Sequence, residues 1–113
     1  MEILNIDNLG NLPNVDTKEI EIPEWKVKVV IRGLTKKMQV DLARITQDEN
    51  NDAFDYQKAL LIVSVVNPPL DDKAIEKLYD LDAQVIDKLF IEISNLNGIG
   101  SEEQTLMSEE FQE

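Results

Sequence analysis

The chain has 113 residues and a formal net charge of −12 at pH 7, and 42% of its residues are hydrophobic while only 5% are aromatic. This length and composition predict one domain with an aliphatic core. Cysteine and histidine are both absent. Their absence excludes disulfides, thiol catalysis and cysteine-bound metals, and it removes the commonest acid–base group and metal ligand.

No stretch of the sequence approaches the roughly eighteen apolar residues that a membrane-spanning helix needs. The first residues also lack the basic-then-apolar pattern of a signal peptide. We therefore expect a protein that stays in the cytoplasm and has no membrane partner.

The charge is distributed unevenly along the chain. Residues 26–44 hold six basic side chains and one acidic one, a net charge of +5, which leaves −17 for the rest. The basic segment either offsets acidic neighbours within the fold or forms a binding patch. Because the molecule as a whole is acidic and repels phosphates, we expect no nucleic-acid partner.

The two ends of the chain have compositions that disfavour packed structure. Residues 1–16 mix asparagines with a glycine and a proline, which predicts a loosely ordered arm. Residues 100–113 contain five glutamates and no basic residue, which predicts a flexible acidic tail. This tail either only aids solubility or folds on a partner, in which case Leu106, Met107 and Phe111 are its candidate contacts.

Residues 17–32 have the period-two pattern of a β-hairpin. Ile20 and Ile22 alternate with glutamates before a Pro-Glu-Trp turn, and aliphatic residues alternate with basic ones after it. The acidic and basic faces of the two strands favour ion pairs across the hairpin. A two-stranded ribbon is marginally stable alone, so we expect it to pack on the helices that follow.

Four helices are predicted after the hairpin, at about 35–47, 53–66, 71–79 and 82–98. Thr35 and Asp82 are suitable N-caps, and either Asp71 or Asp72 caps the third helix. Gly98 is placed to end the last helix in a left-handed conformation. The fold class is therefore α+β, mainly α, with an N-terminal antiparallel hairpin packed on about four helices and a single domain over 17–99.

The second of these helices has a sequence pattern that fits two assignments. Its segment Ala59–Val66 (ALLIVSVV) is almost uniformly apolar and rich in β-branched residues, so that alone it is compatible with a buried strand. The aromatic residues upstream favour a helix in a longer window. Asn67-Pro68-Pro69 then ends it, because consecutive prolines cannot continue a helix.

Motifs for catalysis or metal binding are weak. Asp48, Asn50 and Asp52 resemble the start of a calcium loop, but Ala53 replaces the required glycine and Ala59 the bidentate glutamate. The paired aspartates elsewhere fit helix caps, and the isolated glycines form no phosphate-binding loop. We expect no catalytic residue, no cofactor and no bound metal, and hence no enzyme.

Candidate partner-binding residues lie on the hairpin. Trp25, at its turn, either covers the edge of the core or is an exposed recognition anchor, since tryptophan is enriched in binding hot spots. Lys26, Lys28 and Arg32 follow on the basic strand. Because strand edges can pair and the charge is split, head-to-tail contacts between copies are expected, which gives a homo-oligomer.

The order of these motifs resembles the tail assembly chaperones of long-tailed, siphovirus-like bacteriophages and prophages. The matching segments span residues 17–100. They are Ile22–Trp25 (IPEW), Arg32–Thr35 (RGLT), the apolar Ala59–Val66, Pro68–Asp72 and Leu96–Ile99 (LNGI).

This resemblance implies a non-enzymatic role in building a phage tail. Such chaperones bind the tape measure protein and keep it soluble until the tail tube forms around it, and they are absent from the mature virion. In many phages a frameshifted longer form recruits the tail tube protein. Two other classes stay open: a structural head–tail connector or tail-completion subunit, and an acidic DNA-mimic inhibitor. The basic segment disfavours the mimic, which would present continuous acidic rows.

Overall fold

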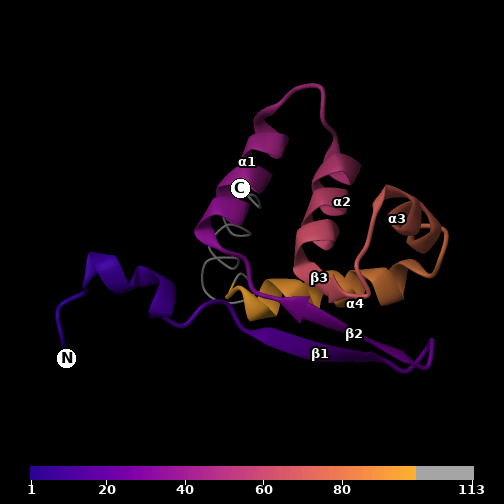
Figure 1. Ribbon diagram of the computed structural model, residues 1–113. Coiled ribbons are helices and arrows are strands. Elements are labelled where there is room, and N and C mark those ends of the chain that lie inside the picture. Colours follow the sequence, from indigo (N-terminus) through magenta and orange to yellow (C-terminus); the bar gives the residue numbers. More distant parts are fainter. Residues whose placement is uncertain (99–113) are drawn as a thin grey trace, which may run out of the picture.

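In a computed structural model, which describes residues 1–98, the chain forms a three-stranded antiparallel sheet and four α-helices (Figure 1). The sheet order is β1-β2-β3. The strands are β1 (Thr17–Ile22), β2 (Val27–Arg32) and β3 (Val65–Asn67), and the helices are α1 (Lys36–Gln47), α2 (Ala53–Ser64), α3 (Asp72–Leu78) and α4 (Ala83–Leu96). The predicted α+β, mainly helical fold class is confirmed.

The helices are arranged around the sheet in two ways. Helix α4 lies along the sheet and contacts β1 and β2, whereas α1 and α2 pack against each other and rise away from it (Figure 1). The core joins these elements. Its most deeply buried aliphatic side chains come from β2, α2, α3 and α4, one from each: Ile31, Leu61, Ile75 and Ile93.

The hairpin has the alternation predicted for β1, whereas Val27 at the start of β2 is 50% exposed. Thr17 pairs with Arg32 and Ile22 with Val27, and the inward Ile20 and Ile22 are 5% and 3% exposed. The turn closes with the Trp25 N–H donating to the Ile22 carbonyl at 3.1 Å. The expected ion pair across the hairpin is present between exposed side chains, with Lys28 Nζ 3.3 Å from a Glu19 carboxylate oxygen.

The helix predicted at 53–66 is too long, because α2 ends at Ser64 and β3 begins at the next residue. Val65 pairs with Ile31, and Asn67 pairs with Val30 across a register irregularity. The β-branched residues at the end of this apolar segment favour a strand. Because β3 pairs with β2, it satisfies backbone N–H and C=O groups that the edge of a lone hairpin leaves without partners. The expected two-stranded sheet therefore has a third strand.

The helix ends agree with the caps expected from the sequence. Thr35 Oγ1 accepts from the Met38 N–H at 3.2 Å, Asp71 caps α3 through the Ala74 N–H, and Asp82 caps α4. Gly98 has a φ of +75°, the left-handed conformation expected after α4. The acidic tail at 100–113 lies outside the described residues.

The N-terminal arm contains structure that the sequence did not predict. Residues Ile6–Asn11 form a 3₁₀ helix, η1, in which no residue is buried. Asn5 Oδ1 starts it by accepting from the Asp7 N–H at 3.0 Å, because short amide and carboxylate side chains close local turns readily. The arm that the composition predicts to be loosely ordered therefore contains one short helix.

Candidate protein-binding surfaces

Lys26 and Lys28 lie together beside the hairpin turn. With Glu21, Pro23 and Val27 they line a shallow hollow of about 420 Å³. Lys26 has a φ of +56°, which directs the chain from the turn into β2. Trp25 is only partly exposed, and it is not one of the residues lining this hollow.

Arg32 lies at the opposite end of β2 and has a contact of its own. Its Nε donates a partly buried hydrogen bond to the Val63 carbonyl at 2.8 Å. That carbonyl belongs to the last turn of α2, where carbonyls lack helical partners and the helix dipole favours a cation. The arrangement gives Arg32 a role in holding α2 against the sheet and separates it from the two lysines.

The hairpin is tied to α4 by two ion pairs on its acidic strand and turn. Lys18 Nζ lies 3.2 Å from a Glu92 oxygen, and Lys88 Nζ lies 3.9 Å from a Glu24 oxygen. All four side chains are partly or largely exposed, so each pair contributes little to stability. They link the sheet edge and the turn to α4.

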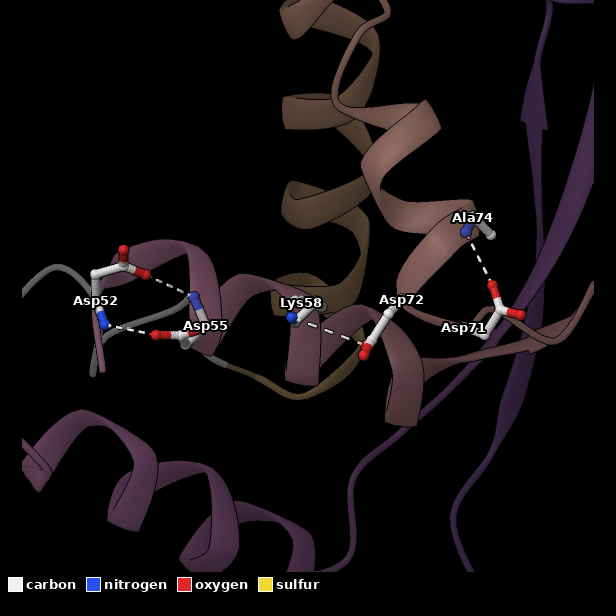
Figure 2. A network of polar contacts seen from close by, with 6 residues as sticks. All are labelled: Asp52, Asp55, Lys58, Asp71, Asp72 and Ala74. Carbon is white, nitrogen blue, oxygen red and sulfur yellow. Dashed lines mark hydrogen bonds and ion pairs between the residues drawn. The ribbon is translucent and has the colours of Figure 1, made fainter. Parts of the chain in front are cut away.

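The clustered aspartates serve as helix caps. Asp52 and Asp55 form a reciprocal capping box at the start of α2, with hydrogen bonds of 2.9 and 3.0 Å between each carboxylate and the other residue's N–H (Figure 2). Near Asp71 at the start of α3, Asp72 instead faces Lys58 Nζ at 3.9 Å (Figure 2). Within residues 1–98, no three acidic side chains are grouped to hold a metal ion.

A largely apolar groove with a volume of about 630 Å³ lies between α1, α2 and α4. Its aliphatic and aromatic lining consists of Leu34, Leu42, Ala43, Tyr56, Leu60, Phe90 and Ile93. Its polar lining consists of Gln39, Thr46, Gln57, Ser94 and Asn97, and none of the lining residues that the structure describes is charged. In a chain with a net charge of −12, an uncharged groove is a distinctive surface.

Sequence reasoning missed this groove as a site. Leu42 and Phe90 belong to apolar stripes on the inner faces of their helices, and helical periodicity alone identifies such stripes as core. Whether neighbouring helices close over such stripes or leave a groove depends on their spacing, which a single sequence does not encode. The uncharged Gln39, Ala43 and Thr46, next to Leu42 on one face of α1, were the available signal.

One titratable side chain beside the groove has a perturbed proton affinity. The Tyr79 hydroxyl donates to Gln57 Oε1 at 2.6 Å, and its ring packs on Phe54 with centroids 4.8 Å apart. Burial, together with the negative charge of Asp87, raises the pKa of Tyr79 above its usual value of 10.0. The residue is therefore a neutral hydrogen-bond donor at physiological pH, and its contact with Gln57 holds one wall of the groove.

No protein-family model, curated protein or solved structure matches the chain. Within residues 1–98, no helix is both long and apolar enough to cross a lipid bilayer.

The predicted contact residues Leu106, Met107 and Phe111 lie outside the described residues. The structure thus places Lys26 and Lys28 together, puts Arg32 elsewhere, and adds the groove as a further candidate surface.

Proposed function

We propose that this chain is a tail assembly chaperone of the kind it resembles, a non-enzymatic protein that binds a helical segment of a phage tape measure protein. The groove between α1, α2 and α4 is the observation that carries the proposal. An amphipathic helix can place its apolar face in such a groove, a common mode of peptide recognition. A tape measure protein, which is helix-rich and partly hydrophobic in the family that this chain resembles, supplies such segments.

The charge of the chain supports the same role. The client's apolar face meets an uncharged lining, while the rest of the complex keeps the high negative charge that holds proteins apart in solution. The chaperone acts in the cytoplasm of the bacterial host, where several copies bind along one elongated client. A frameshifted longer form would recruit the tail tube protein.

Co-expression with tape measure fragments tests this function. The full chain should keep a fragment soluble and co-purify with it, and the Ala43→Trp variant should do neither, because Ala43 is exposed and lines the groove. Arg44→Trp is the matched control, since Arg44 is the next residue on α1 and does not line the groove. If both variants capture the fragment equally well, the client site lies elsewhere on the chain.

Purified virions separate this proposal from the structural alternative. A chaperone is released before the tail is complete, so mass spectrometry of intact particles should not detect the chain. A head–tail connector or tail-completion subunit would be present at a fixed number of copies per particle. Detection at such a fixed stoichiometry would end the chaperone proposal.

A further inference from the structure

Among the described residues, none buries the aliphatic side chains of the N-terminal arm. Every residue from 1 to 14 is exposed, including large aliphatic side chains. Ile3, Leu4 and Ile6 are 95%, 59% and 70% exposed, and Leu9 and Leu12 are about half exposed at 48% and 49%. Aliphatic exposure concentrated in one segment marks an interaction surface more often than isolated exposed residues do.

The arm is directed away from the body of the protein. Val15 packs beside Gly33, and the Gly33 N–H donates to the Asp16 carbonyl at 2.9 Å, so the arm is fixed at the end of the sheet. From this point η1 lies to one side, apart from all four helices (Figure 1). The arm in this position does not cover the groove of its own chain.

We infer that the arm of one copy binds in the α1–α2–α4 groove of a second copy. The two surfaces match in chemistry, because the groove lining is uncharged and residues 1–14 carry only Glu2 and Asp7 as charged side chains. Lys36, whose Nζ lies 3.4 Å from the groove residue Gln39, is placed at the rim to meet one of these acids. This inference goes beyond the proposed function and depends only on the arm and the groove.

The nearly uncharged arm and groove limit the electrostatic cost of this contact. Each chain carries a net charge of −12, so two copies repel each other at long range, and a contact between acidic surfaces would add to that repulsion. Arm and groove are different surfaces of the same chain, so their contact is head-to-tail and builds a ring or an open array. A client segment would compete with the arm, since both would occupy one groove.

The salt dependence separates this contact from one made by charges. Salt screens the long-range repulsion between acidic copies, so an apolar arm contact should strengthen as the salt concentration rises. Contacts between the basic segment of one copy and the acidic surface of another should weaken instead. Sedimentation velocity at low and moderate salt shows directly whether self-association strengthens or weakens with salt. Weaker self-association at the higher salt concentration would overturn the inference.

Paired variants of the full chain test each side of the contact. Ile6→Ser with Leu9→Ser should weaken self-association by about tenfold or more, because it removes two aliphatic side chains from the contact. Asn8→Ser with Asn11→Ser is the matched control on the same 3₁₀ helix. On the groove side, Ala43→Trp should have the same effect as the arm variant, and Thr46→Trp provides a second position if the first disturbs folding, as judged by circular dichroism.

The decisive measurement mixes the arm variant, Ile6→Ser with Leu9→Ser, with the groove variant, Ala43→Trp. The arm variant keeps an open groove and the groove variant keeps an intact arm, so the two should form a one-to-one dimer that neither forms alone. An unmodified protein that stays monomeric at all concentrations would overturn the inference, because its arm then binds no other copy. An arm variant that associates as well as the unmodified protein would also overturn it, by assigning the contact to the β1 edge or to residues 99–113.

Whether client capture fails is a separate result. The arm variant retains its groove, so under the proposed function it still solubilises tape measure fragments. Loss of self-association with retained capture supports both proposals. Retained self-association through the arm without any capture would leave the arm contact standing and remove the chaperone function.

Discussion

The side-chain amide of Asn97 joins the end of α4 to the start of α1 through Leu34. Asn97 Oδ1 accepts from the Leu34 N–H at 2.7 Å, and Nδ2 donates to the Ile93 carbonyl at 2.8 Å. Both hydrogen bonds are partly buried. Because Leu34, Ile93 and Asn97 all line the groove, this one amide fixes the geometry of its end.

Replacing Asn97 with alanine should destabilise the fold. The Asn97→Ala variant leaves the Leu34 N–H without its partner, and we expect a loss of about 1–3 kcal/mol in the free energy of unfolding. Urea denaturation measures this change. Asn95→Ala is the control, because Asn95 is exposed two residues earlier on α4. Equal effects of the two substitutions would show that the amide bridge contributes nothing.

Ser64 presents the opposite case, a buried polar group without a partner. Its side chain is 0% exposed, and its hydroxyl makes no hydrogen bond to any described residue. Ser64→Ala should therefore raise the free energy of unfolding by about 1 kcal/mol, because burying an unpaired hydroxyl is unfavourable. Ser94→Ala, at a partly exposed position on α4, should change it little. A less stable Ser64→Ala protein would indicate that the hydroxyl is bonded in solution.

The parts of the fold that depend on local sequence were predictable. Thr35, Asp71 and Asp82 cap their helices because a side chain reaches backbone N–H groups two or three residues ahead. Strand β3 was not predictable in this way. Its Val65 pairs with Ile31 on β2. The sequence pattern around Val65 and Val66 carries no information about the open edge of β2, which lies far away in the chain.

The candidate site was predictable only in part, for a related reason. Alternation along β2 placed Lys28 correctly on the exposed face, and it assigned Arg32 to the same basic surface. It could not reveal that α2 ends beside Arg32 and that the Val63 carbonyl accepts a hydrogen bond from the Arg32 guanidinium. Charge patterns in sequence do not distinguish a free cation from one bound to a helix end.

Tyr79 predicts a loss of stability at alkaline pH. Its pKa is raised in the folded protein by burial and by Asp87, whereas in the unfolded chain it ionises near its usual value of 10.0. The folded state thus holds the phenolic proton more tightly. The stability that this difference provides is complete below pH 10 and is lost as the pH rises through the folded-state pKa.

The Tyr79→Phe variant isolates this contribution. At neutral pH it should be less stable by about 1 kcal/mol, because the hydrogen bond to Gln57 is missing. Above pH 10 the difference between the two proteins should narrow, since only the unmodified chain ionises Tyr79. The chain has two tyrosines, so a Tyr56→Phe background lets phenolate absorbance follow Tyr79 alone. A constant difference at all pH values would contradict the raised pKa.

Arg32 provides the last prediction, because its contact with Val63 gives it a structural role in place of partner binding. Arg32→Ala removes a charge-assisted hydrogen bond to the end of α2, and we expect a loss of about 1–2 kcal/mol in the free energy of unfolding. Lys28→Ala is the control on the same strand, since Lys28 makes only an exposed ion pair with Glu19 and its removal should change stability little.

The same pair of variants separates structural effects from binding effects. Client capture measured well below the unfolding midpoint should be unchanged in Arg32→Ala, because the folded state keeps its groove. Lys28 is free of such a structural contact, so a loss of capture in Lys28→Ala would identify the hollow at the hairpin turn as part of the client site. Reduced capture by Arg32→Ala at unchanged stability would reverse the assignment and return Arg32 to the binding surface.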